Sequence, residues 1–174
     1  MTSIVILTFN KLDYTKKCIE SIRKYTDKGS YEIIVVDNAS SDGTIKWLKE
    51  QSDIITILNN DNVGFPRGCN QGIEVAKGSE ISLLNNDVIV TPNWLNNMLN
   101  ALYHNKKIGA VGPVTNSAPG QEIDITYTSE GEVGNFAIET TNKYKGKWIE
   151  KTKLVGFCML IKKSVIDKVG VLDE

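Results

Sequence analysis

Runs of apolar, β-branched residues recur along the chain at the length of a single strand. The clearest are SIVILTF and YEIIVV, which are too short for helices and too uniformly apolar for strands with one face in water. Such runs predict strands that are buried on both faces of a sheet. We expect strands at residues 3–9, 31–36, 53–58, 80–85 and 154–162.

The segments between these runs place apolar residues at helical spacing. In the first of them, Leu12, Ile19 and Ile22 share one face of a helix, as expected for a helix that covers a sheet. A second long stripe comes from one Trp, one Met and three Leu residues in residues 94–102. The predicted helices span residues 11–26, 43–51, 66–77, 92–105 and 164–169.

Residues with known preferences for helix ends mark where these helices begin. Asn10 can cap the first helix, and Ser41 or Asp42 can cap the second. Pro66 and Pro92 suit the first turns of the third and fourth helices, where no backbone N–H is needed.

Alternation of strand and helix with short connections predicts right-handed crossovers and an α/β fold with a mainly parallel sheet flanked by helices. Residues 115–150 differ, because they are rich in Gly, Asn, Thr and Glu and have only short apolar runs. We expect an irregular excursion with a hairpin or two there, and the least ordered part of the chain. With no repeat in the sequence, we expect one domain over residues 1–174.

Composition narrows the class of protein. The chain has 174 residues, 41% of them apolar, and a formal charge of −1, which gives no electrostatic reason to expect a nucleic-acid partner. No apolar run approaches the roughly 18 residues that predict a membrane span. Three widely spaced cysteines suggest buried thiols in a reducing compartment. A single histidine makes histidine-rich metal sites improbable, so any metal should have oxygen ligands.

Polar side chains follow each of the first four predicted strands. Because the carboxyl ends of parallel strands meet at one edge of a sheet, this edge is where α/β proteins bind ligands. We therefore predict that Thr8, Asp37, Arg67, Asn85 and Asp87 line a single cleft there. Structural explanations also exist: Asp37 can belong to a turn, and Arg67 to a solvated first turn of a helix.

The sequence Asn85-Asn86-Asp87 is the most informative of these strand ends. It interrupts an apolar run without the glycine that a hairpin turn would use. Residues 85 and 87 project on the same side if the backbone stays extended, and they offer an amide and a carboxylate oxygen. A site with only two protein ligands suits a divalent cation that takes its other ligands from phosphates and water. The triplet predicts a site for a metal-bound anion.

Several function classes fit an acidic, metal-binding α/β protein. The fingerprints of dinucleotide-binding and P-loop proteins, GxGxxG and GxxxxGK[ST], are absent. A nucleotidyltransferase would need a glycine-rich basic loop after the first strand, where TFNKLDYTKK has no glycine. A receiver-type signalling module would need an acidic pair at that point. A module that only binds nucleotide-sugar remains an alternative.

Taken together, these segments resemble the amino-terminal, nucleotide-sugar-binding part of family 2 glycosyltransferases, which have the Rossmann-like GT-A fold. The resemblance is greatest to rhamnosyltransferase-type members of bacterial polysaccharide assembly. The matching pieces occur in family order and leave out only about 115–150. They are SIVILTFN, CIESI, EIIVVDNASSDGT, NNDNVGFPRGCNQGIEVAKG, ISLLNNDVIVTPNWL, IGAVGP and GFCMLIKKSVIDKVGVLDE.

The resemblance implies roles for the residues at the strand ends. Asp37 matches the carboxylate that hydrogen-bonds a pyrimidine base, and Arg67 lies in the segment that approaches base and diphosphate. Asp87 matches the last acidic residue of the DXD motif, the main protein ligand of Mg²⁺ or Mn²⁺, although Asn85 replaces its first aspartate. The implied nucleotide-binding residues are Thr8, Asn10, Asp37, Asn38, Asp42, Arg67, Asn70, Asn85 and Asn86.

The same resemblance implies the reaction and the division of the chain. Residues 1–114 would form the nucleotide-binding half and 115–174 the start of the acceptor half, truncated at the C-terminus. The expected activity is inverting transfer of a sugar from a UDP- or dTDP-sugar to a glycan or lipid-linked acceptor, in the cytoplasm or peripherally at the inner face of the membrane. The catalytic base is expected beyond Glu174, so the fragment should bind donor but transfer sugar poorly.

Overall fold

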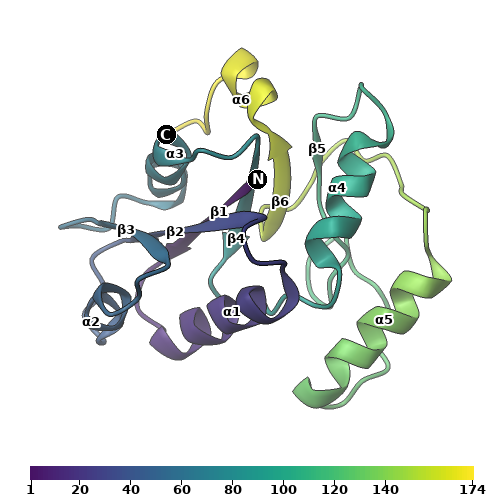
Figure 1. The fold of residues 1–174 in the computed structure, drawn as a ribbon, viewed down its shortest axis with the longest axis horizontal. Coiled ribbons are helices and arrows are strands. Elements are labelled where there is room, and N and C mark those ends of the chain that lie inside the picture. The colour runs from purple at the N-terminus through teal and green to yellow at the C-terminus, as the bar shows by residue number, and fades with distance from the viewer.

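A twisted six-stranded sheet forms the centre of the molecule, with strand order β3-β2-β1-β4-β6-β5 (Figure 1). The computed structural model describes all 174 residues. Strands β1 to β4 pair in parallel, whereas β6 runs antiparallel to both of its neighbours, β4 and β5. The predicted α/β class with a mainly parallel sheet is therefore confirmed. The strands are β1 (Thr2–Thr8), β2 (Tyr31–Asp37), β3 (Ile54–Leu58), β4 (Glu80–Asn85), β5 (Ala110–Val111) and β6 (Cys158–Lys162).

Helices cover both faces of the sheet, so the core has two parts. On one face, helices α1, α2 and α4 pack against side chains such as Ile4, Ile6 and Leu160. On the other face, α3 and α6 pack against Val5, Ile34 and their neighbours. The helices are α1 (Leu12–Tyr25), α2 (Thr44–Lys49), α3 (Phe65–Val75), α4 (Trp94–His104), α5 (Val133–Lys143) and α6 (Lys163–Val169), with a 3₁₀ turn at Glu130–Glu132.

The central strands are apolar on both sides for this reason. Successive side chains of a strand point to opposite faces, so Ile4 and Ile6 enter one half of the core while Val5 enters the other. All three are at most 1% exposed. The uniform apolar runs in the sequence therefore indicated central strands that have helices on both sides.

Two glycines let α3 lie unusually close to β1. A Cβ atom on Gly68 would overlap the Cδ1 of Leu7, and one on Gly72 would overlap the Cγ1 of Val5. The two glycines are four residues apart and so face the sheet together. Their missing side chains set the depth at which α3 packs.

Two helix starts differ from the prediction. Asn10 does not cap α1: Asn10 and Lys11 both have left-handed backbone angles, and the Leu12 N–H donates to Asp42 from the next loop. Pro92 lies outside α4, because Pro92 and Asn93 are the central residues of a turn closed by a hydrogen bond from the Trp94 N–H to the Thr91 carbonyl. Pro66 does lie in the first turn of α3, as expected.

The prediction of hairpins within residues 115–150 is wrong for its second half. Residues 133–143 form α5, and in Figure 1 this helix lies beyond α4, away from the sheet. None of its side chains is buried. A helix without a buried stripe leaves no apolar period in the sequence, which is why the pattern did not reveal it. No helix in the structure is long and apolar enough to cross a membrane.

The close packing of α3 gives a testable prediction. Gly72→Ala should lower the free energy of unfolding by about 1 to 3 kcal/mol, because the added methyl group overlaps Val5, which is itself buried and cannot move aside. Chemical denaturation measures the change. Gly134→Ala in α5 is the matched control: its Cβ would meet only the Tyr25 hydroxyl at an ordinary 3.6 Å. Equal stability of the two variants would contradict the packing argument.

Candidate functional site: a cleft at the carboxyl edge of the sheet

An open cleft of about 320 Å³ lies where β1, β2 and β4 end and α3 begins. It combines amide side chains, one carboxylate and two aromatic rings. Of the five residues predicted to line one cleft, Thr8, Asn85 and Asp87 do so, whereas Asp37 and Arg67 do not. The lining residues are Leu7, Thr8, Phe9, Asn38, Asn62, Gly64, Phe65, Asn85, Asn86 and Asp87.

The Asn85–Asp87 triplet forms a turn that presents its carboxylate to the cleft. The Val88 N–H donates to the Asn85 carbonyl over 3.3 Å, and the strand does not resume after it, contrary to the sequence interpretation. The Asn86 amide donates to the hydroxyls of Thr8 and Thr15 at 3.2 and 3.0 Å. This contact fixes the turn against β1 and α1, while Asp87 is exposed to solvent.

Asp37 lies beneath the cleft rather than on its surface. It is fully buried, and its Oδ1 accepts the backbone N–H of Ser40 at 2.8 Å, which closes a tight loop with a left-handed Ala39. Its other oxygen, Oδ2, is buried without a hydrogen-bond partner. Any contact between Asp37 and a nucleobase therefore requires Asn38–Ser40 to shift.

Asn10 joins the loops that follow β1 and β2. Its Oδ1 accepts the Ser41 N–H at 2.8 Å, and its own N–H donates to the Ser40 hydroxyl at 2.6 Å. Asparagine tolerates the left-handed conformation that this position has. The side chain thus shapes the rim of the cleft without lining it.

Asp42 holds the amino ends of two helices at once. Its Oδ2 accepts the Leu12 N–H at the start of α1, and its Oδ1 accepts the N–H and the hydroxyl of Thr44 at the start of α2. Although partial burial opposes the charged form, the hydrogen bonds from Thr44 and from the Leu12 backbone hold the pKa of this carboxyl below its ordinary value. Both oxygens are therefore engaged away from the cleft.

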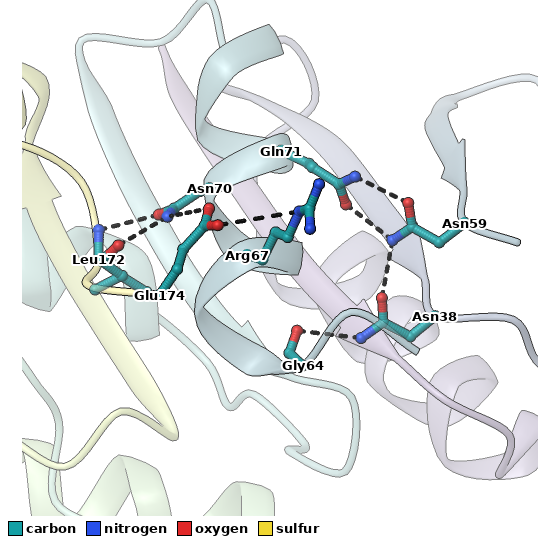
Figure 2. A network of polar contacts seen from close by, with 8 residues as sticks. All are labelled: Asn38, Asn59, Gly64, Arg67, Asn70, Gln71, Leu172 and Glu174. Carbon is teal, nitrogen blue, oxygen red and sulfur yellow. Dashed lines mark hydrogen bonds and ion pairs between the residues drawn. The ribbon is translucent and has the colours of Figure 1, made fainter. Parts of the chain in front are cut away.

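Asn38 belongs to a chain of amide side chains that supports one wall of the cleft (Figure 2). Its Nδ2 donates to the Gly64 carbonyl at 3.2 Å and to Asn62 at 3.1 Å. Its Oδ1 accepts from Asn59, which exchanges two further hydrogen bonds with Gln71 of α3. This network links the end of β2 to the loop before α3.

Asn70 faces the other side of α3, toward the last residues of the chain, and Arg67 lies between Gln71 and Glu174 (Figure 2). The Asn70 amide donates to the Leu172 carbonyl at 2.8 Å and accepts the Leu172 N–H at 3.0 Å. Arg67 lies 4.0 Å from the carboxylate of Glu174 and is largely exposed. In the structure these two predicted nucleotide contacts hold residues 172–174 against α3 instead.

Sequence reasoning missed the aromatic residues of the cleft. Phe9 and Phe65 both line it and are 48% and 44% exposed. A phenylalanine that directly follows a buried strand, or that precedes Pro66 at a helix start, lies at the sheet edge rather than in the core. That position was a usable signal, because large apolar side chains at a ligand-binding edge provide flat surfaces for stacking.

The three cysteines are core residues, as predicted. Cys18, Cys69 and Cys158 are all free and buried. Burial raises the pKa of the Cys69 and Cys158 thiols to about 12. They would remain protonated at neutral pH, which excludes them as nucleophiles.

The oxygen donors of the cleft fit a metal ion only if it shares its ligands with a bound anion. No group of three or more acidic, cysteine or histidine side chains comes together anywhere in the structure. Asp87 offers one exposed carboxylate, and Asn85 beside it offers an amide oxygen. Such a donor set suits Mg²⁺ or Mn²⁺ completed by phosphate oxygens and water, but not a metal held by protein alone.

Comparison with known proteins follows this geometry. The family model described as "Glycosyl transferase family 2" matches residues 3–170. The glycosyltransferase AglE of Haloferax volcanii is 23% identical over 174 residues, which cover 97% of this chain and 54% of AglE.

Two solved structures share the fold. The mannosyltransferase PcManGT of Pyrobaculum calidifontis, in complex with GDP-Man and Mn²⁺, superposes with a TM-score of 0.71 at 18% identity, over 98% of this chain and 46% of that one. S. aureus TarS 1-349, in complex with UDP-GlcNAc, superposes with a TM-score of 0.70 at 15% identity. The match covers 96% of this chain and 46% of that one. These matches show the GT-A fold that the sequence predicted, and the chain spans about half the length of AglE, of PcManGT and of TarS 1-349.

The double role of Asp42 predicts a measurable loss of stability. Asp42→Ala should lower the free energy of unfolding by about 1 to 2 kcal/mol, because two helix starts lose their acceptor. Asp42→Asn keeps one acceptor oxygen, so its free energy of unfolding should lie between those of wild type and Asp42→Ala.

The pH dependence follows from the lowered pKa. The stabilisation by Asp42 should be complete above the ordinary carboxyl pKa of 3.8 and should disappear as the pH falls through the lower folded value. Denaturation of wild type and Asp42→Ala over this pH range measures it. A difference that did not decrease as the pH was lowered below 3.8 would contradict a role for the charged form.

Proposed function

Because the chain belongs to glycosyl transferase family 2, we propose that it is the donor-binding part of an enzyme that transfers a sugar from a nucleotide-diphosphate donor to an acceptor hydroxyl. The observation that carries this proposal is the composition of the cleft. One exposed carboxylate, Asp87, lies on the same open surface as two half-exposed aromatic rings and a rim of amides. A nucleotide-sugar has the matching parts: a flat base, polar sugars and a charged diphosphate.

The aromatic rings would bind the base. Phe9 and Phe65 are the only aromatic residues that line the cleft, and they come from two different elements, after β1 and at the start of α3. Stacking of a base on an aromatic side chain contributes about 1 to 3 kcal/mol. Asn38 and Asn62, beside Phe65, would orient the base and ribose by hydrogen bonds.

The diphosphate would lie toward the Asn85–Asp87 turn. Asp87, with Asn85 beside it, would hold a Mg²⁺ or Mn²⁺ ion, which neutralises the charge that develops on the leaving diphosphate. Asn86 keeps the turn in place through Thr8 and Thr15. The Mn²⁺ bound to PcManGT with GDP-Man supports a divalent metal for this fold.

The donor base is proposed to be uracil or thymine, as in UDP- or dTDP-sugars. The buried Asp37 supports this, because its unpaired Oδ2 could accept the N3–H of a pyrimidine once Asn38–Ser40 move. UDP-GlcNAc bound to TarS supports a UDP-sugar donor, whereas GDP-Man bound to PcManGT makes guanine the base to be tested against it. We propose transfer of a hexose or deoxyhexose, as in rhamnosyltransferases.

The acceptor reaction is proposed to proceed with inversion. A carboxylate would remove the proton from the acceptor hydroxyl as it attacks the anomeric carbon. Asp87 is the only carboxylate that lines the cleft and is assigned to the metal, so the base would come from outside this set of lining residues. The proposed acceptor is a glycan or a lipid-linked sugar of a bacterial cell-surface polysaccharide. The reduced, buried cysteines support a cytoplasmic location.

Metal-dependent donor binding is the first test of this function. Calorimetry of the chain with UDP and dTDP should show binding that Mn²⁺ strengthens, and Asp87→Ala should remove the effect of the metal, about tenfold or more in affinity. Asp124→Ala removes an exposed carboxylate far from the cleft in sequence and should bind as wild type. Nucleotide binding that neither Mn²⁺ nor Asp87→Ala changed would contradict the proposed metal site.

Base stacking is the second test. Phe65→Ala should weaken binding of UDP and of uridine alone by a similar factor, about five- to hundredfold, because it removes a contact to the base. Asp87→Ala should leave uridine binding unchanged, because uridine has no phosphate. If Phe65→Ala weakened the binding of UDP but not that of uridine, the base would bind elsewhere.

A further inference from the structure

A short basic and aromatic segment, residues 143–153, follows α5 on the surface. Its sequence, KYKGKWIEKTK, contains five lysines and one glutamate, although the whole chain has a formal charge of −1. Every residue of the segment is exposed. None of the five lysines forms an ion pair, because the ion pairs of the structure involve Lys17, Arg23 and Arg67. The positive charge of the segment is therefore available to a partner.

The same segment exposes apolar side chains between its lysines. Ile149 is 80% exposed, and Tyr144 and Trp148 are 43% and 42% exposed. The Trp148 ring packs against His104 at the end of α4, with ring centroids 4.9 Å apart. A turn closed by a hydrogen bond from Lys147 N–H to the Tyr144 carbonyl precedes it, with Gly146 in the left-handed region. The aromatic side chains are thus presented by a defined backbone.

The contact with His104 places the segment at the end of the sheet opposite the cleft. Helix α4 starts after the Asn85–Asp87 turn and runs back along the sheet, so that Tyr103 hydrogen-bonds Glu80 at the beginning of β4. Around this helix end lies a second hollow of about 510 Å³, lined by Tyr103, Lys106, Lys162 and Lys163 among others. This end of α4 therefore carries further lysines, together with Asp167.

We propose that the 143–153 segment binds the surface of a membrane that contains anionic lipids. Lysines attract such a surface electrostatically, while tryptophan and tyrosine prefer the boundary between headgroups and hydrocarbon. Long lysine stems can lie along the apolar boundary with their charges in water. The alternation of lysines with Tyr144, Trp148 and Ile149 combines these requirements within eleven residues.

A membrane fits this surface better than a folded protein partner does. A stable protein interface covers about 800 Å² on each side and has a central cluster of apolar residues. The segment offers only three apolar side chains, interspersed with lysines. Because it lies away from the cleft, membrane contact would leave the donor site open to water. The inference rests on this surface alone and does not depend on the proposed donor.

Vesicle binding by the 174-residue chain tests the proposal. The protein should sediment with vesicles of phosphatidylcholine and phosphatidylglycerol but not with phosphatidylcholine alone, and salt should release it. The fluorescence of Trp148 should shift to the blue on binding and be quenched by brominated lipid. Trp148→Phe should abolish both signals, because Trp94 is buried and Trp47 is partly buried in the core.

Matched variants separate this surface from general charge. Replacing Lys145, Lys147 and Lys151 by Gln should lower the vesicle–water partition coefficient by tenfold or more, because each lysine near an anionic surface contributes about fivefold. Replacing Lys28, Lys46 and Lys49, which are equally exposed, should have little effect. Ile149→Ser should weaken binding severalfold, whereas Val169→Ser, at 74% exposure, should not.

Three results would overturn the proposal. The first is equal binding to neutral and anionic vesicles. The second is an equal loss of vesicle binding in the two triple lysine variants. The third is binding to a soluble polyanion that is as tight as binding to vesicles and is not accompanied by a blue shift of Trp148. Circular dichroism and thermal denaturation of each variant show whether it is folded, so that a lost signal is assigned to the surface.

Discussion

The depth at which α3 packs on β1 is the constraint on which the cleft depends. Gly68 and Gly72 remove the two side chains that would hold the helix away from Leu7 and Val5. With the helix at this depth, its first residue, Phe65, reaches the rim of the cleft, and Gln71 reaches Asn59. One wall of the cleft is therefore set by the absence of two methyl groups on the side of the helix that faces the sheet.

Helix α3 also connects the cleft to the end of the chain. On one side its amide network runs through Asn59 to Asn38, and on the other Asn70 pairs with both backbone groups of Leu172 (Figure 2). A displacement of the helix would therefore disturb both sets of contacts. Residues that resemble ligand contacts in sequence, such as Asn70, maintain this architecture in the structure.

The sequence predicted the strands and the edge that carries the cleft, because uniform apolar runs report burial on two faces and parallel strands end together. For the same reason it predicted Thr8, Asn85 and Asp87 as lining positions, and these three of the five predicted residues do line the cleft. The turn at Asp37 and the cap of α2 by Asp42 were among the structural roles that the sequence allowed. The burial of Asp37 and the second role of Asp42, at the start of α1, did not follow, since a short carboxylate in a tight loop can turn inward to accept backbone N–H groups. Helix α5 was missed because it buries no side chain.

The position of β6 has a consequence for how the chain reaches this structure during synthesis. Residues 158–162 insert between β4 and β5, which precede them by about seventy and fifty residues. Until they leave the ribosome, β4 keeps an unpaired edge that carries Ile81 and Leu83, both buried in the finished sheet. A nascent chain in that condition can pair with another, so a chaperone or rapid completion of synthesis would protect it from aggregation.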